Sequence, residues 1–261
     1  MVDFFGFGKF DKELIEGFLS WQHICFVSFF VVLLFGLGIF LGIKNRPKSD
    51  KEKNRVLIVA AIIIDTLEIM HTIFVCVKTG NPNMWLHYLP LFLCSIQLVT
   101  IPLAAFTRGR LREAALDFVF IFGVIGALAG TYGAGNIYSV FPVFTYEVLH
   151  STLTHTISGF CSLYIGISGM ASMKKKNIPI SFAIISVSCV LAYIVNKCIN
   201  TNYMFLDNGE GTPYEIFRQL VNNDPVLYPL IVVSLFFICI TAFYLVYYLV
   251  TKKKATPEVK E

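Results

Sequence analysis

The sequence predicts an all-α, polytopic membrane protein with seven transmembrane helices. Two observations predict this fold class. First, 56% of the 261 residues are apolar and only 15% are charged, whereas about 25% of the residues of a soluble domain are charged. Second, the apolar residues gather into runs of about 20, the length that crosses a bilayer core of about 30 Å. The runs are 21–43, 55–78, 86–107, 114–135, 145–169, 179–199 and 225–250.

The basic residues between these runs predict the orientation of the chain. Cytoplasmic segments are enriched in Lys and Arg. Of the 21 basic residues, 16 follow the first, third, fifth and seventh runs, and five lie at the N-terminus or after the other runs. We therefore expect the N-terminus outside and the C-terminus in the cytoplasm, with the chain crossing the plasma membrane several times. The basic segments are expected to contact anionic lipid head groups.

The chain divides into three expected parts. Residues 1–20 form an outer interfacial segment, residues 21–251 the seven-helix domain, and residues 252–261 a cytoplasmic basic tail. The first part is expected to be amphipathic and to lie along the membrane surface, because four apolar side chains recur there at helical spacing. These are Phe7, Phe10, Leu14 and Phe18. The first run has no basic segment ahead of it, so a cleaved signal peptide is not expected.

Ionisable side chains inside the runs are the candidates for chemistry, because each costs at least about 2.5–3.5 kcal/mol to insert. Asp65, Glu68 and His71 recur at three-residue steps and share one face of the second helix. Cys94 lies in the third run, with Gln97 almost one helical turn later. The fifth run contains Glu147, His150 and His155. The seven cysteines lie in or beside apolar runs and are interpreted as membrane thiols, not as a disulfide framework.

Depth along the helices suggests that three of these groups share one level. At a rise of about 1.5 Å per residue, Cys94 lies roughly 12 Å below the outer end of its run, and His155 and Glu68 each roughly 15 Å. Such a trio suits acyl transfer or hydrolysis. Cys94 would be the nucleophile, His155 the base, and Glu68 would orient the imidazole or position the substrate. Alternatively, a buried Cys behaves as a small hydrophobe, and a His can simply bond across helices.

Other site classes are less well supported by the sequence. Glu68 with His71 and Glu147 with His150 form two Glu-x-x-His pairs, but a di-iron centre also needs a Glu from each of two further helices. No metal is therefore expected. A retinal Schiff base is excluded because the seventh run has no Lys, and nucleic-acid binding has no support. A transporter or ion-coupled solute binder that uses Asp65, Glu68, His71 and His155 remains the alternative function.

Several motifs then resemble a known family. They are LPLFLC at 89–94, TRGRLRE at 107–113, GVIGALAG at 123–130, HTISGFCSLY at 155–164 and NTNYMFL at 200–206. In this order the motifs resemble the bacterial YwaF-like integral membrane proteins. That group is similar to the eukaryotic transmembrane-protein-164 family of Cys/His-dependent acyltransferases, which remodel phospholipids. One departure is Phe92, which stands where the bacterial proteins usually have a His beside the Cys.

The resemblance implies a function and a set of site residues. It places the nucleophile at Cys94 and the base at His155, acting on a membrane phospholipid or lysophospholipid and needing no cofactor. We expect Asn202 to donate to a developing oxyanion and Tyr203 to line the mouth of the site. Further substrate-binding or orienting candidates complete the set. They are Glu68, Gln97, His150, Asp65 and His23. The oligomeric state is not predicted.

Overall fold

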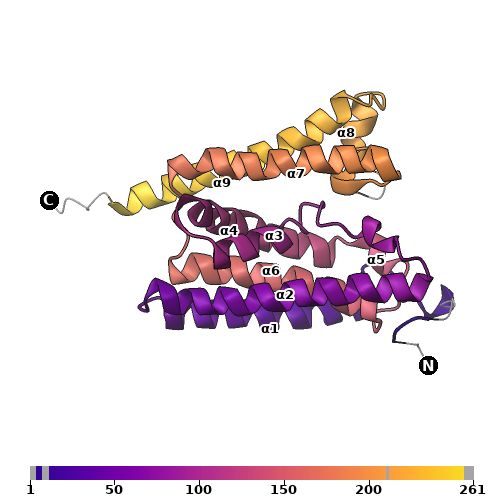
Figure 1. The fold of residues 1–261 in the computed structure, drawn as a ribbon, viewed down its shortest axis with the longest axis horizontal. Helices are drawn as coiled ribbons and strands as arrows, with labels where there is room; N and C mark the ends of the chain where they lie inside the picture. Colours follow the sequence, from indigo (N-terminus) through magenta and orange to yellow (C-terminus); the bar gives the residue numbers. More distant parts are fainter. Residues whose placement is uncertain (1–3, 8–11, 210–211, 256–261) are drawn as a thin grey trace. The chain divides into compact units, whose positions relative to one another are not determined.

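The computed structural model describes residues 4–7, 12–209 and 212–255, apart from the side chains of residues 12 and 252–255. The described residues form helices joined by turns (Figure 1). They divide into two compact units, Met1–Ser172 and Met173–Glu261. The expected basic tail, residues 252–261, lies mostly outside the described residues.

The first unit is built from four long helices and several short ones. The long helices are α1 (Trp21–Asn45), α2 (Asp50–Thr79), α4 (Gly109–Tyr132) and α6 (Tyr146–Ser168). The shorter ones are η1 (Lys12–Leu14), η2 (Met84–His87), α3 (Gln97–Phe106) and α5 (Gly135–Tyr138). The long helices coincide closely with the first, second, fourth and fifth apolar runs of the sequence.

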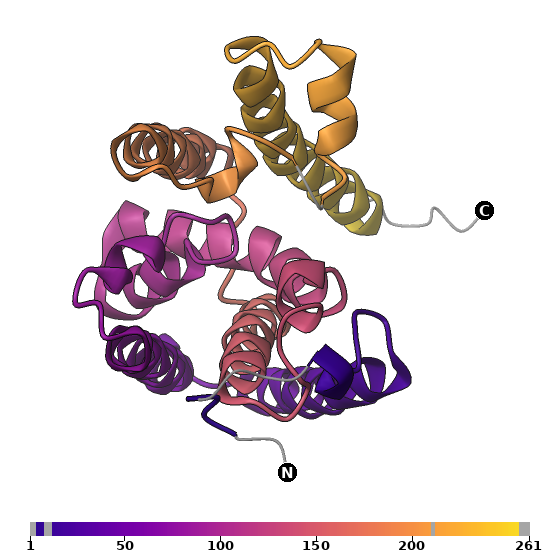
Figure 2. The ribbon, with the colours of Figure 1, turned by 90° about the vertical axis from the view of Figure 1, so that its right-hand side faces the viewer.

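Helix α6 is the central helix of this unit. It contacts α1, α2, α3 and α4, and in the end-on view its coil lies among the helices of the unit (Figure 2). Most of its polar side chains are buried, including Glu147 and His150. A helix enclosed by other helices has little lipid-facing surface, so it can carry polar groups that a peripheral membrane helix could not.

Local sequence signals set the ends of the long helices. Helix α2 begins with a capping box, in which Ser49 accepts from the Glu52 backbone N–H and the Glu52 carboxylate accepts from the Ser49 backbone N–H. It ends at Gly80, whose φ of 63° is left-handed and suits a residue without a Cβ. Gly169, with φ of 76°, ends α6 in the same way. These signals set the ends of each helix and therefore the positions of the functional side chains along it.

The third expected span is not one continuous helix. The chain over residues 86–107 forms the end of η2, an irregular segment at 88–96, and the ten-residue helix α3. Pro90 lacks a backbone N–H and restricts the residue before it, which accounts for the interruption. Irregular backbone at membrane depth is tolerated where it is enclosed by protein or lines a cavity. The interruption places Cys94 in this irregular segment, just before α3.

The N-terminal segment also differs from the expected continuous amphipathic helix. In its described part only η1 is helical, and Gly6, Gly17 and Leu19 adopt positive φ values that interrupt a right-handed helix. The segment instead packs on the first unit. The Phe4 carbonyl accepts from the Tyr146 N–H at 2.8 Å. Phe10, one of the four apolar residues of the expected face, lies outside the described residues.

The second unit pairs two long helices. These are α7 (Ile178–Ile199) and α9 (Leu227–Ala255), accompanied by η3 (Lys175–Asn177), η4 (Tyr203–Phe205) and α8 (Glu215–Leu220). Asp224 caps the start of α9 by accepting from two backbone N–H groups, those of Val226 and Leu227, each at 2.8 Å. These hydrogen bonds hold the pKa of the Asp224 carboxyl below its usual value.

Five segments of the described chain are long and apolar enough to span a membrane. They are Trp21–Asn45, Asp50–Thr79, Gly109–Tyr138, Lys175–Ile199 and Leu227–Thr251. Helix α6 has 23 residues, but its Ser, Thr and His side chains make it less apolar. The chain is therefore a multi-pass membrane protein. The two other expected spans, α6 and the interrupted segment containing α3, stay predictions.

Candidate functional site

A small cavity inside the first unit brings together the three groups that the sequence predicts to lie at one depth in the membrane. Glu68 of α2, Cys94 of the irregular segment and His155 of α6 all line it. The other lining residues are Ile64, Ser95, Leu98, Thr154 and Ser158. The cavity therefore combines a thiol, an imidazole and a carboxylate with hydroxyl groups and apolar side chains.

The imidazole of His155 is held in one orientation by its own helix. Its Nδ1 lies 2.7 Å from the carbonyl oxygen of Ser151, one turn earlier in α6. Because a carbonyl can only accept, Nδ1 carries the proton and Nε2 is left as the acceptor in the neutral ring. Helix position alone therefore selects the tautomer that a general base requires.

Helix α4 makes room for this imidazole. A Cβ at Gly130 would overlap Cδ2 and Nε2 of His155. Gly126, one turn earlier, lies beside Cys94, and a Cβ there would be 3.8 Å from both Cα and Cβ of Cys94. The glycine face of α4 thus packs directly against both reactive residues. The sequence analysis did not identify the fit of Gly130 to the His155 ring.

Cys94 and His155 are in direct contact. A side-chain hydrogen bond joins the thiol and the imidazole, and Ser95 also bonds the thiol through its side chain. Since Nδ1 of His155 is engaged by Ser151, the thiol donates to Nε2. Cys94 also lies just before the first turn of α3, where the positive end of the helix dipole favours a negative charge. The arrangement can convert the thiol into a nucleophilic thiolate.

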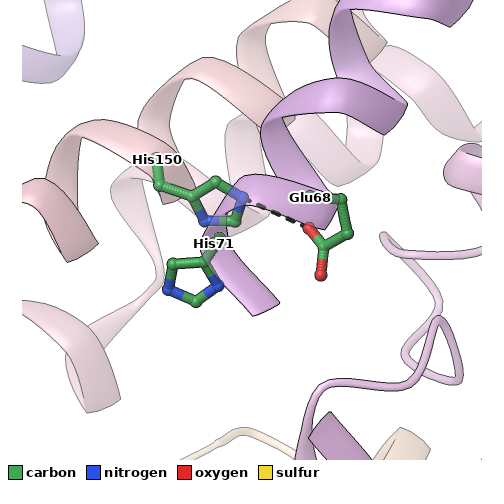
Figure 3. Close-up of side chains that lie close together, drawn as sticks. All are labelled: Glu68, His71 and His150. Carbon is green, nitrogen blue, oxygen red and sulfur yellow. Dashed lines mark ion pairs between the residues drawn. The ribbon is translucent and has the colours of Figure 1, made fainter. Parts of the chain in front are cut away.

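A second cluster of ionisable groups lies beside this cavity. His71 of α2 and His150 of α6 stack with ring centroids 3.9 Å apart and an interplanar angle of 3°. His150 Nε2 lies 3.2 Å from Oε2 of Glu68, and Figure 3 shows a nitrogen of each ring on the side of that carboxylate. Glu68 therefore belongs both to the cavity and to this cluster, which we call the Glu-His-His cluster.

The second Glu-x-x-His pair of the sequence is split in the fold. Glu147 forms an ion pair with Lys78 of α2, whereas His150 turns toward Glu68. Three of the four residues in the two pairs, Glu68, His71 and His150, offer ligand atoms that lie within 4.8 Å of one another. The fold therefore brings three potential metal ligands together, and the two further Glu ligands of a di-iron centre are not among them.

His23 has a structural explanation. Its side chain is fully buried, Nε2 lies 2.9 Å from the Thr131 carbonyl oxygen, and Nδ1 accepts from the Leu19 N–H at 3.1 Å. Its ring also stacks on Tyr138 with centroids 3.7 Å apart. Both nitrogens are engaged, so this imidazole ties α1 to α4 and has no nitrogen left for a substrate.

Gln97 and Asp65 are close in the sequence to residues that line the cavity, but they do not line it themselves. The Gln97 side chain is buried, and its Oε1 accepts from Thr100 at 3.2 Å. Asp65 is half-buried on α2, three residues before Glu68. These positions assign neither residue a contact with Cys94 or His155.

Asn202 and Tyr203 belong to the second unit and organise the loop after α7. The amide of Asn202 donates to the carbonyl of Asn208 at 2.9 Å, and its oxygen accepts from the Asp207 N–H at 3.0 Å. Tyr203 is buried, and its backbone is bound by the side chain of Asn196. Within their own unit, these residues hold a loop in shape.

Sequence reasoning missed two contributors to the site. Ser151 acts through its backbone carbonyl, and its position four residues before His155 is the signal that could have revealed it. Gly130 acts through the absence of a side chain, and its helical spacing from Gly126 was the available signal. In both cases the missing information was which face of the helix meets the histidine.

Comparison with known proteins places the chain in a family. Residues 18–252 match the sequence model of the TMEM164 family, and this match spans well over half of the chain. The chain therefore belongs to the TMEM164 family. No curated protein and no solved structure matches it.

Proposed function

We propose that this member of the TMEM164 family is a membrane-embedded acyltransferase or acyl hydrolase that acts on a glycerolipid through a Cys94 thioester. One observation carries the proposal. The Cys94 thiol is hydrogen-bonded to the His155 imidazole, whose other nitrogen is fixed by the Ser151 carbonyl. A nucleophile, a base and a group that orients the base are the parts that nucleophilic catalysis requires.

The first half-reaction transfers the acyl group to the enzyme. His155 Nε2 takes the thiol proton, and the thiolate of Cys94 attacks the ester carbonyl carbon of a phospholipid. The tetrahedral intermediate collapses, the carbon–oxygen bond to the glycerol breaks, and the imidazolium returns the proton to the leaving alkoxide. A thioester on Cys94 and a lysophospholipid result.

The second half-reaction releases the acyl group to an acceptor. His155 Nε2 takes a proton from water or from the hydroxyl of a lysophospholipid, and the resulting oxygen nucleophile attacks the thioester carbonyl. The carbon–sulfur bond breaks, and the proton on the imidazolium returns to the Cys94 thiolate. Water as acceptor yields a free fatty acid, and a lysophospholipid yields a remodelled phospholipid.

Intact-mass spectrometry tests this proposal most directly. Protein purified with native lipid is measured before and after neutral hydroxylamine, which cleaves thioesters, and is compared with Cys94→Ala and His155→Ala variants. We expect a fatty-acyl mass that hydroxylamine removes from the unchanged protein and that both variants lack. A short-lived intermediate calls for an activated acyl donor, which should label Cys94 only when His155 is present. An absence of both adduct and His155-dependent labelling contradicts the proposal.

The proposal also includes the finer placement of the chain. We propose a bacterial YwaF-like member with seven spans, the N-terminus outside, the C-terminus in the cytoplasm, and a location in the plasma membrane. Its partners are phospholipid or lysophospholipid at the cavity and anionic head groups at the basic segments. Alkylation of single cysteines placed in each connecting segment, with a reagent that does not cross the membrane, tests this topology.

A transporter or ion-coupled solute binder is the second candidate function. The observation that favours it is the Glu-His-His cluster, because intramembrane acids and imidazoles also mark proton and ion pathways. Two variants separate the candidates. A carrier should tolerate Cys94→Ala and lose function on Glu68→Gln, whereas an acyltransferase should be abolished by Cys94→Ala.

A further inference from the structure

We propose that Glu68, His71 and His150 form a binding site for one transition-metal ion, most suitably Zn²⁺. The three residues supply two imidazole nitrogens and a carboxylate oxygen. Two His and one Glu form a ligand set that zinc accepts, and three protein ligands leave a fourth tetrahedral position open. The site lies outside the Cys94–His155 pair, and its existence does not depend on the proposed acyl transfer.

Unpartnered polar atoms provide an independent reason to expect a ligand here. His71 and His150 are 6% and 8% exposed. Nδ1 of His71 and Nε2 of His150 are buried without a hydrogen-bond partner in the described part of the chain. A buried polar group without a partner is unfavourable, because it has lost its hydrogen bonds to water without replacing them. A cation bound between the rings and the carboxylate would give both nitrogens a partner.

The contact between His150 and Glu68 supports the same inference. Nε2 lies 3.2 Å from the Glu68 carboxylate oxygen, close enough for an ion pair, but the two atoms do not meet in hydrogen-bond geometry. Nε2 therefore faces the carboxylate without a hydrogen bond to it, and a metal ion bound between the two groups would give both of them a partner. This arrangement distinguishes His150 from His23, both of whose nitrogens are engaged by backbone groups.

The ligand atoms of the cluster lie somewhat farther apart than those around a bound zinc ion. Ligand atoms around a tetrahedral zinc, with bonds of about 2.0–2.1 Å, lie roughly 3.3 Å apart. The ligand atoms of the cluster lie within 4.8 Å of one another. Because imidazole lone pairs lie in the ring plane, the two parallel rings must also tilt toward the ion. Zinc binding would therefore bring together side chains on the facing surfaces of α2 and α6.

Lys78 is a cation near the cluster, and its charge is balanced by an ion pair with Glu147. The Tyr88 ring packs edge-on against His71 with centroids 5.0 Å apart, and the Tyr146 ring lies 5.9 Å from the same imidazole. Aromatic walls of this kind limit access of water and strengthen the attraction between the metal ion and its ligands.

Direct metal binding tests the inference. The protein is purified in detergent with an affinity tag that contains no histidines, stripped with a chelator, and titrated with Zn²⁺ and separately with Co²⁺. We expect about one Zn²⁺ per chain and a visible Co²⁺ absorption band typical of four-coordination. His71→Gln, His150→Gln and Glu68→Gln should each weaken binding at least about tenfold. His87→Gln is the matched control, because His87 is an exposed histidine outside the cluster.

Three further measurements keep the test decisive. Size-exclusion chromatography and thermal unfolding show whether each variant is folded. X-ray absorption at the zinc edge of the unchanged protein reports the ligand atoms directly, and we expect nitrogen and oxygen without sulfur. Sulfur in the coordination shell, equal zinc uptake by the cluster variants, or no uptake by the unchanged protein would overturn the inference. Cys94→Ala should retain zinc, so failure of the metal site and failure of the thioester mechanism are distinguishable.

Discussion

His150 and His155 lie five residues apart on α6, yet their surroundings differ in kind. His155 has one nitrogen on the Ser151 carbonyl and the other on the Cys94 thiol. His150 stacks on His71, and its Nε2 lacks a hydrogen bond within the described part of the chain. In the functions that we propose, the first imidazole moves a proton and the second binds a cation.

The neighbouring helices cause this difference. Helix α4 presents glycines to His155, which leave space for the ring and bring Cys94 close. Helix α2 presents Glu68 and His71 to His150, which add ligand atoms around its ring. The role of a buried histidine therefore depends on what the facing helix offers. A substitution in α4 beside His155 should therefore leave the surroundings of His150 intact.

The largest effect is expected from Cys94→Ala. Removing the nucleophile should lower acyl transfer by at least about a thousandfold, because binding and electrostatic effects alone remain. Zinc uptake should be unchanged. Transfer of a labelled acyl chain between lipids in vesicles, together with metal content, provides the measurement. Residual transfer within tenfold of the unchanged protein contradicts the role of Cys94.

Gly130→Ala should displace the His155 ring. The added Cβ overlaps Nε2 and Cδ2, so the imidazole must rotate away from the thiol. A displacement of about 1 Å can cost about a hundredfold in rate. We expect acyl transfer in the vesicle assay to fall by about that factor, with zinc binding retained.

Gly126→Ala is the matched control for this substitution. It places the same methyl group one turn away, at an ordinary contact distance of 3.8 Å from Cys94. Acyl transfer should stay within about threefold of the unchanged protein. An equal loss in both variants would show that α4 packing in general, and not the His155 position, limits the reaction.

The effect of Glu68→Gln should be less specific to one site, because Glu68 belongs to both. An amide is a weaker zinc ligand than a carboxylate, so zinc affinity should fall by about 10–100-fold. Acyl transfer should fall by less than about tenfold, since Ser151 already orients His155. Isothermal titration with Zn²⁺ and the vesicle assay supply the two numbers. Complete loss of function with intact labelling of Cys94 would favour the ion-pathway hypothesis.

His23→Phe should have the smallest effect on either site. Phenylalanine keeps an aromatic ring against Tyr138 but loses both hydrogen bonds of the imidazole. The free energy of unfolding should fall by about 1–3 kcal/mol, because the Thr131 carbonyl and the Leu19 N–H lose their partner. Denaturant unfolding in detergent measures this change. Activity per folded molecule should be unaffected, and a specific loss of activity would place His23 in the site after all.

Much of the helical layout could be predicted from the sequence. Capping residues such as Ser49 and Gly80, together with the length of the apolar runs, define α2 to within a few residues of the expected span. The interruption near Pro90 could have been expected from the proline itself, but an apolar composition hides a break in the helix. The N-terminal segment illustrates a similar limit, since helical spacing of phenylalanines does not overcome positive φ at Gly17.

The candidate site was predictable only in part. Counting residues at a helical rise predicts one level for Cys94, Glu68 and His155, and all three line the cavity, although Cys94 lies in an irregular segment and not on a helix. Whether two groups at one level touch depends on the rotation and order of the helices around the bundle, which a count does not provide. The separation of Glu147 from His150, which are less than one turn apart, is a consequence of that rotation.

Hydropathy and local backbone signals, which act over a few residues, were enough to establish the membrane class, the position of most long helices and the ionisable residues within them. Tertiary packing was needed to bring His155 to Cys94, to fit the imidazole against Gly130, and to join His150 with Glu68 and His71. All but one of these pairings join residues that are about 60 to 80 positions apart in the sequence. They arise because packing selects one face of each helix, and the selected face depends on every neighbouring helix at once.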